Sequence, residues 1–148
     1  MTAKEYLEQA RTLDMEINSK LEMVSSLRAM AERTTSALSR AVVSRSRDDH
    51  QMEETIAKIV DLEREVNEDI DRLVELKREI MGVIRKLDDP VDRYLLSMRY
   101  ICGKNWEEIA DAMNYHIRTI YKVHDRAIQK MENLLERIKL HADSERRA

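Results

Sequence analysis

Apolar side chains recur every seventh residue in the middle of the chain. One unbroken row consists of Met52, Ile59, Val66, Leu73, Ile80 and Leu87. A second row is interrupted by Glu63 and Lys77 and otherwise contains Ile56, Ile70 and Ile84. This spacing predicts a coiled-coil helix over residues 52–87, about 54 Å long at about 1.5 Å per residue. Three more residues widen its apolar face, so we expect it to touch more than one neighbour: Leu62, Leu76 and Val83.

The N-terminal segment has the same spacing. Its unbroken row is Ala10, Ile17, Val24, Ala31 and Leu38, and Lys20 and Thr34 interrupt the companion row. Thr2 and Glu5 have the spacing of a capping box, which predicts a helix from about Ala3 to roughly Val43. Residues 44–51 contain no apolar side chain and predict a turn. A continuous polar helix is the alternative there, because the stretch also lacks Gly and Pro.

The pattern leaves the partner of these long helices open. They can pair with each other as an antiparallel hairpin, or the same seam can hold a homodimer or a higher oligomer. The chain has two Gly, one Pro and no Phe, and 37% of its residues are charged. Such a composition favours an all-helical protein in either arrangement.

A break follows at Asp89 and Pro90. Proline suits the first turn of a helix, and the preceding aspartate suits its N-cap. We therefore predict a helix over residues 91–101, which Gly103 ends in a left-handed conformation. Asn105 is then a suitable N-cap for the next helix.

Residues 106–125 have the spacing of a helix-turn-helix. Counting Trp106 as the first position, the small residue needed where two helices touch is the fifth, Ala110. Asn114, the ninth, suits the left-handed backbone of the turn. We expect the two helices to share one apolar face, formed by Ile109, Met113, Tyr115, Ile120 and Val123.

The last helix is predicted from about Ile117 to about His141, before a frayed polar tail. The sequence as a whole predicts an all-α fold. Long N-terminal helices form a coiled-coil hairpin or oligomer over residues 1–88, and a helix-turn-helix domain follows over residues 89–148.

Charge is distributed unevenly along the chain, whose net charge is −3. Residues 1–89 carry 15 basic and 20 acidic side chains, whereas residues 90–148 carry 11 and 9. The basic excess therefore lies with the helix-turn-helix, as in a nucleic-acid-binding segment. The single Cys102 excludes an internal disulfide and a cysteine-based zinc site. No apolar run approaches membrane-spanning length, so we expect a soluble cytoplasmic protein without a membrane partner.

Residues 95–128 resemble region 4, the C-terminal DNA-binding region of sigma-70 family transcription factors. The residues that carry the resemblance are Met98-Arg99-Tyr100, Gly103, Trp106-Glu107-Glu108-Ile109-Ala110, Met113, Arg118-Thr119-Ile120-Tyr121 and Arg126-Ala127-Ile128. Two residues depart from the family pattern. Asn114 stands where the family has Gly, and His116 stands where it has the Ser that caps the recognition helix.

The resemblance implies a protein that reads double-stranded DNA. The remainder differs from a sigma factor, because promoter melting requires aromatic side chains that stack on unpaired bases, whereas residues 1–89 contain only Tyr6. A helical N-terminal half joined to a region 4-like end is similar to small phage regulators of the ArpU and RinA kind, which act on late-gene transcription in prophages of Gram-positive bacteria. This similarity implies a phage or prophage transcription regulator, with RNA polymerase as a further candidate partner.

The outward face of the last helix carries the candidate DNA contacts. Arg118 is best suited to guanine, because its planar fork matches two acceptors in the major groove, and Ile117 suits a thymine methyl group. A basic stripe with four-residue spacing should reach the phosphates at its far end. The predicted DNA-binding residues are His116, Ile117, Arg118, Thr119, Tyr121, Lys122, Arg126 and Lys130. A solvated helix face is the alternative interpretation of the stripe.

Other conspicuous residues have simpler interpretations. Trp106 is expected to pack in the core, and His124 to lie at the core edge or near a phosphate. Arg99 and Lys104 are weaker candidates for phosphate contact. We find no catalytic triad, phosphate-binding glycine loop or metal-ligand spacing, so the prediction is no enzyme activity, no metal and no cofactor.

Three functions fit these observations. The first is a sequence-specific transcription regulator, either monomeric or a homodimer through its N-terminal helices. The second is a phage DNA-packaging protein such as a small terminase subunit, which would form a ring of many subunits. The third is a helical protein–protein adaptor, for which charge reversal at Arg118 and Lys122 would leave the function intact.

Overall fold

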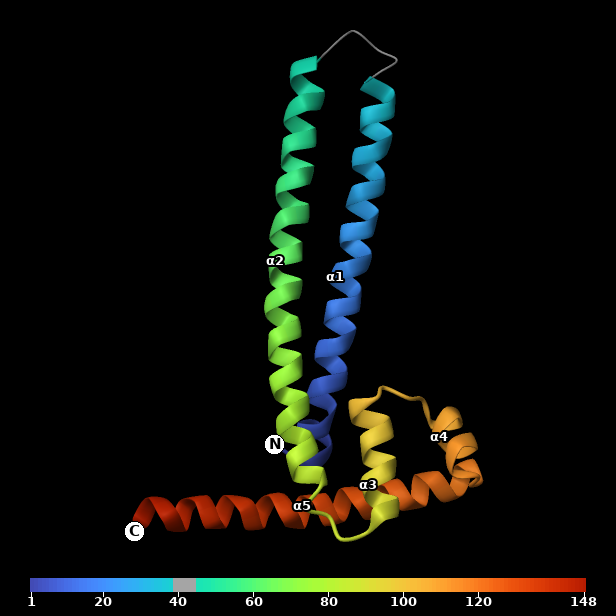
Figure 1. Ribbon diagram of the computed structural model, residues 1–148, viewed down its shortest axis with the longest axis vertical. Helices are drawn as coiled ribbons and strands as arrows, with labels where there is room; N and C mark the ends of the chain where they lie inside the picture. Colours follow the sequence, from blue (N-terminus) through green and yellow to red (C-terminus); the bar gives the residue numbers. More distant parts are fainter. Residues whose placement is uncertain (39–44) are drawn as a thin grey trace. The chain divides into compact units, whose positions relative to one another are not determined.

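The computed structural model describes residues 1–38 and 45–148, and every regular element within them is a helix. The elements are α1 (Ala3–Leu38), α2 (Arg45–Ile84), α3 (Pro90–Leu96), a π-helical turn η1 (Ser97–Ile101), α4 (Trp106–Met113) and α5 (Ile117–Arg147). Figure 1 shows α1 and α2 as a long antiparallel hairpin, followed by the shorter α3 and α4 and by α5. The all-α prediction is confirmed, and of the two arrangements left open the chain adopts the hairpin.

The described residues form two compact units, each with its own core. Residues 13–73 form the hairpin unit, and residues 1–12 and 74–148 form the terminal unit. The domain boundary that we predicted between residues 88 and 89 falls inside the terminal unit. Whether residues 89–148 fold independently stays a prediction.

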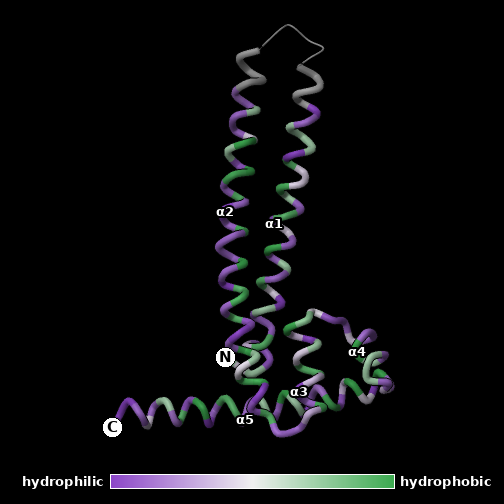
Figure 2. Tube along the Cα trace, in the orientation of Figure 1, coloured by the Kyte–Doolittle hydropathy of each residue, from purple (hydrophilic) through white to green (hydrophobic). Residues whose placement is uncertain are grey.

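The hairpin unit buries one heptad row from each helix. Ile17 and Val24 of α1 are buried, as are Ile59, Val66 and Leu73 of α2. Figure 2 shows the corresponding alternation of apolar and polar bands along both helices. Side chains seven residues apart return to nearly the same face of a helix, so the two rows can meet along the hairpin.

Charged residues beside the buried rows form ion pairs across the hairpin. The Lys20 Nζ lies 2.6 Å from Asp69 Oδ2 and 3.5 Å from Glu65 Oε2. The carboxylate of Asp69 is buried, and its hydrogen bond raises the pKa of Lys20. Arg28 likewise pairs with Glu63. A shift of the helices would separate the buried Asp69 from its cation, so these pairs favour a single register.

The second apolar row of α2 is not covered within the hairpin unit. Ile56 and Ile70 are exposed there, although the wide apolar face led us to expect a second neighbour. Two helices bury only the stripe along their line of contact, and the adjoining stripe needs another helix.

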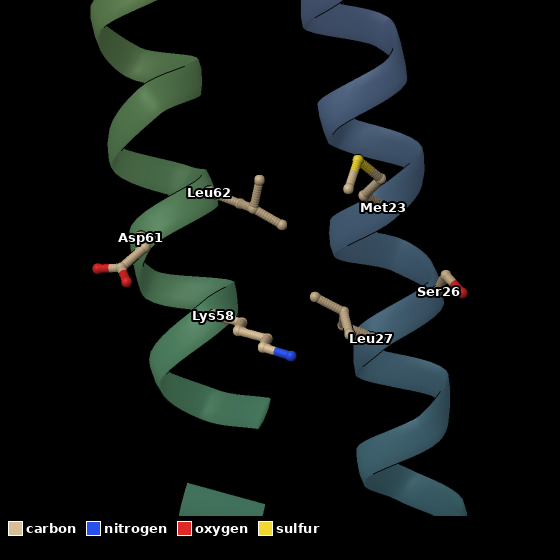
Figure 3. Close-up of a pocket in the computed structure, with 6 residues that line it drawn as sticks. All are labelled: Met23, Ser26, Leu27, Lys58, Asp61 and Leu62. Carbon is tan, nitrogen blue, oxygen red and sulfur yellow. The ribbon is translucent and has the colours of Figure 1, made fainter. Parts of the chain in front are cut away.

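On the same hairpin, a shallow groove is lined by Met23, Ser26, Leu27, Lys58, Asp61 and Leu62, with Leu27 and Leu62 directed into it (Figure 3).

Helix boundaries differ from the predictions in three places. Helix α2 already begins at Arg45, so the predicted turn is wrong for residues 45–51, which lack a Gly or Pro to break the helix. The predicted end of the first helix near Val43 lies outside the described residues, as does Ser44. At the other end α2 stops at Ile84, before Leu87. Helix α5 continues to Arg147, where we expected a frayed tail.

The terminal unit packs the beginning of α1 with α3, α4 and α5. Its buried residues include Leu7 of α1, Ile84 of α2, Leu95 of α3, Ile109 of α4 and Met131 of α5. The Ala3 backbone N–H donates a hydrogen bond to Glu132 Oε2 at 2.8 Å, and the Tyr6 hydroxyl donates to Glu79 Oε1 at 3.2 Å. Helix α5 contacts both α3 and α4, and its C-terminal end is exposed.

Cap residues close most of these helices as expected. Thr2 and Glu5 form the predicted capping box, with 3.2 Å and 2.9 Å hydrogen bonds. Asp89 Oδ1 accepts a hydrogen bond from the Val91 backbone N–H at 2.8 Å at the start of α3. The predicted helix over residues 91–101 widens after Leu96 into the π-helical turn η1, which buries Tyr100.

Within the described ranges, no helix combines the length and the hydropathy needed to cross a bilayer.

Candidate nucleic-acid interface

Helix α4 is held at both ends by asparagine. At its start, Asn105 Oδ1 accepts a hydrogen bond from the Glu108 backbone N–H at 2.8 Å. At its end, Asn114 has a left-handed backbone, with φ 57° and ψ 41°. The Asn114 N–H donates to Asp111 O at 3.2 Å, and the Tyr115 N–H donates to Ala110 O at 3.0 Å. This is the hydrogen-bond pattern of a Schellman motif, and it confirms the left-handed turn predicted at Asn114.

Helix α5 starts immediately after this turn. His116 has an extended backbone, and its Nδ1 accepts a hydrogen bond from the Arg118 backbone N–H at 3.2 Å. The imidazole therefore caps the helix. Asn105, α4, the turn and α5 together form a helix-turn-helix.

The two helices share most of the predicted apolar face. Ile109, Ala110, Ile120 and Val123 are buried, and Met113 is half-buried. The prediction was wrong for Tyr115, whose side chain is 40% exposed. It follows the left-handed residue that reverses the chain, and a residue at this point no longer follows the period of α4.

The basic stripe lies on the exposed face of α5. The side chains of Arg118, Lys122 and Arg126 are exposed, and no carboxylate among residues 1–33 and 50–148, whose side chains the structure describes, forms an ion pair with them. Thr119, Lys122 and Arg126 also line a shallow hollow, together with Val123 and Asp125. Successive cations lie about 6 Å apart along the helix axis. Every second phosphate of one DNA strand lies about 6.8 Å further along the DNA axis, which is a similar spacing.

Lys130, the last member of the stripe, lies close to carboxylates of the α3 region. Its Nζ is 2.7 Å from Asp92 Oδ2 and 3.9 Å from Asp89 Oδ2. The carboxylate of Asp92 is buried, and its hydrogen bond raises the pKa of Lys130. This ammonium therefore links α5 to the first turn of α3, and it is the member of the stripe that is least available for phosphate.

The remaining predicted residues surround the first turns of α5. His116 and Thr119 are exposed, and Ile117 is half-buried. Tyr121 is 45% exposed and meets the Trp106 ring edge-on, with ring centroids 5.7 Å apart. The structure thus brings the predicted residues together along one helix and its cap, although their contact with DNA stays a prediction.

Behind this face lies an aromatic cluster that we predicted only in part. Trp106 meets the His124 ring at a centroid distance of 4.6 Å, which supports the expected packing role. The Arg99 guanidinium lies 4.2 Å from the centroid of the Trp106 ring, and its Nη1 donates to Lys104 O at 3.2 Å. Arg99 is therefore engaged in packing on Trp106 rather than directed at solvent as a phosphate contact would be.

His124 and Tyr100 form the polar centre of the cluster. The Tyr100 hydroxyl oxygen lies 2.7 Å from His124 Nε2, and both residues are buried. Burial lowers the pKa of His124 to about 4. Burial, reinforced by the Glu8 carboxylate, raises the pKa of Tyr100 to about 12. His124 follows the buried Ile120 by four residues, so it lies on the same inward face of α5. This spacing could have assigned His124 to the core from the sequence.

Acid is expected to destabilise the terminal unit through His124. The unfolded chain binds a proton near pH 6.5, whereas folded His124 stays neutral down to a pKa of about 4. The unfolded state therefore holds more protons between these values, and stability is lost as the pH falls through this window, by up to about 3 kcal/mol. Urea unfolding followed by Trp106 fluorescence at several pH values measures the loss.

His124→Gln provides the control, because glutamine retains a hydrogen-bonding group but does not titrate. The difference in unfolding free energy between the wild type and this variant should decrease as the pH falls from 6.5 to 4. A constant difference would assign the acid sensitivity to other groups.

The exposed face offers hydrogen-bond donors and positive charge. A guanidinium donates in a planar fork, an ammonium acts as a compact cation, and hydroxyl groups both donate and accept. These are the groups that contact phosphates and base edges. Among the residues that the structure describes, no three His, Cys, Asp or Glu side chains gather in a way that could hold a metal ion.

The fold and this face define the chain as an all-helical protein with a helix-turn-helix whose second helix is basic on its exposed side. Residues 41–132 match the DUF1492 family, which is described as a protein of unknown function. The chain belongs to this family. No curated protein and no solved structure matches it. The family match includes all of α2 and continues to the middle of α5, so it includes the helix-turn-helix.

Proposed function

We propose that this protein is a sequence-specific, double-stranded DNA-binding transcription regulator encoded by a phage or prophage, with α5 as its recognition helix. The observation that carries the proposal is the exposed row of Arg118, Lys122 and Arg126, which have no carboxylate partner among the described residues. The row begins in the first turn of the second helix of the helix-turn-helix, which is the part of such a motif that meets base edges. The resemblance of residues 95–128 to sigma region 4 supports the same orientation.

The residues of this face have different roles in the proposal. Arg118 reads a guanine through its fork, and Ile117 contacts a thymine methyl group. Lys122 and Arg126 contact phosphates, with Thr119 and Tyr121 beside them on the DNA backbone. His116 presents its ring at the start of the helix while its Nδ1 serves as the cap. Lys130 joins the phosphate contacts only by exchanging its carboxylate partners for DNA.

The proposal includes a cellular setting. The similarity to phage late regulators adds RNA polymerase as a second partner, contacted outside the recognition helix. DNA and polymerase share the bacterial cytoplasm, so the protein acts there. Its activity consists of binding, and no catalytic residue or cofactor takes part.

Selection from a random-sequence duplex pool tests the proposal. The wild-type protein should enrich one sequence motif, and fluorescence anisotropy should then give a lower dissociation constant for that duplex than for a scrambled one. Binding to both duplexes should weaken as salt is added, because each phosphate contact releases a counterion. The specific duplex should keep an affinity advantage of about 10³ or more at physiological salt.

Arg118→Ala/Lys122→Ala should abolish the enrichment. Arg137→Ala/Lys139→Ala is the matched control, because it removes the same charge from exposed positions further along α5 and should leave the motif unchanged. Salt-sensitive binding without any motif would favour the packaging function over regulation. Absence of binding at low salt would contradict the proposal and leave the protein–protein adaptor.

A further inference from the structure

Helix α2 carries more apolar surface than the hairpin covers. Ile59, Val66 and Leu73 are buried against α1. The adjacent stripe of the same helix consists of four aliphatic residues that are 41–50% exposed: Ile56, Val60, Ile70 and Val74. We call these four residues the exposed seam. A solvated helix face is normally polar, whereas two adjoining apolar stripes are typical of a helix with two helical neighbours.

The exposed seam has the spacing of a coiled-coil core. Positions 56, 60, 63, 67, 70 and 74 alternate steps of four and three residues, so all six lie along one line of α2. The outer positions are aliphatic and β-branched, and the two central ones are Glu63 and Asn67. Within the chain, Glu63 pairs with Arg28. The Glu63 carboxylate therefore does not present an uncompensated charge.

We propose that a second copy of this chain packs on the exposed seam, with its α2 antiparallel to the first, so that two hairpins form a four-helix bundle. In this register Ile56 meets Val74 of the second copy, Val60 meets Ile70 of the second copy, and Glu63 meets Asn67 of the second copy. The two-fold axis repeats each contact in the opposite sense. Every aliphatic residue then faces an aliphatic residue, and each carboxylate faces an amide that can donate a hydrogen bond.

This matching identifies a second copy as the occupant. The order of apolar and polar positions is the same in both directions along the exposed seam, and a surface that pairs with itself across a two-fold axis requires that symmetry. A parallel pairing would instead place Lys77 against Lys77, a like-charge contact that opposes association, and Glu63 against Glu63, where Arg28 offsets the charge. The inference rests on the residues of helix α2 and does not depend on DNA binding.

Sedimentation velocity of the full-length protein over roughly two decades of concentration tests the association. The wild type should behave as a reversible dimer. Val60→Lys alone and Ile70→Glu alone should each raise the dimer dissociation constant at least about 100-fold, because each places a charge against an aliphatic residue of the second copy. Far-UV circular dichroism should show unchanged helix content, since both positions are already exposed in the single chain.

Mixing the two variants tests the register. In the antiparallel arrangement a lysine at position 60 of one chain faces a glutamate at position 70 of the other, so the mixture should dimerise when neither variant does so alone. Met23→Lys is the matched control, because it charges another exposed apolar residue of the hairpin and should leave the dimer intact.

Three results would overturn the proposal. The wild type could remain a single chain throughout, which would leave the seam to a different protein, or it could form a ring of many subunits. Alternatively, the mixture of variants could fail to dimerise, which would exclude this antiparallel register.

Discussion

Shortening Ile120 to alanine is expected to lower the free energy of unfolding by about 2–5 kcal/mol. Ile120 is fully buried on the inward face of α5, next to the buried Val123 and Ala127. The substitution removes three carbon atoms and leaves a cavity where α5 packs on α4, and the close-packed interior relaxes only in part. Urea unfolding measures the change, with Trp106 fluorescence as the probe of the terminal unit.

Leu140→Ala is the control for this prediction. It lies on the same helix but is 69% exposed, so its effect should remain within about 0.5 kcal/mol. The Ile120 variant should also bind DNA more weakly at temperatures where part of it is unfolded. Equal stability of the two variants would mean that α5 does not pack through Ile120, and the helix-turn-helix core would need to be reassigned.

Replacing Arg118 by alanine is expected to weaken binding to the selected duplex by about 10- to 100-fold, or about 1–3 kcal/mol, and to relax base preference at one position. The reason is the loss of a planar fork that donates two hydrogen bonds to one guanine. Arg118→Lys should recover little of this loss, because an ammonium cannot make the paired contact. Anisotropy titrations on duplexes that vary at each position of the motif measure both effects.

Lys122→Ala provides the contrast, because a phosphate contact carries no sequence information. It should weaken binding to selected and scrambled duplexes alike and reduce the slope of log affinity against log salt by about 1. If Arg118→Ala weakened both duplexes equally, Arg118 would be a phosphate contact and another residue would read the bases. If it changed neither, the basic stripe would be an ordinary solvated helix face.

The ends of the helices could be predicted from the sequence because capping depends on neighbours a few residues away. Asn114 took the left-handed conformation that its side chain tolerates, and Asn105 and Asp89 capped the helices that follow them. The departures from prediction are also local. The π-helical turn at Ser97–Ile101 leaves the ordinary helical period, so Tyr100 was not among the predicted core residues.

The candidate DNA-binding face was predictable for a similar reason. The inward residues Ile120 and Val123 determine which side of α5 is outward, and Arg118, Lys122 and Arg126 then follow from helical spacing. Lys130 obeys the same spacing, but its environment depends on Asp92, which lies 38 residues earlier. The periodic pattern along α5 cannot show that Lys130 pairs with Asp92, because Asp92 belongs to a different helix.

By itself the sequence determined an all-helical chain, the faces of its helices and the turn between α4 and α5, because period, propensity and capping operate over short distances along the chain. Only the tertiary structure decided what covers each face. It paired α1 with α2, matched Lys20 with Asp69, joined His124 to Tyr100, and tied the backbone of Ala3 to Glu132, 129 residues away. A helical period identifies the apolar side of a helix, but several partners can bury that side equally well, and their selection depends on contacts between residues far apart in the chain.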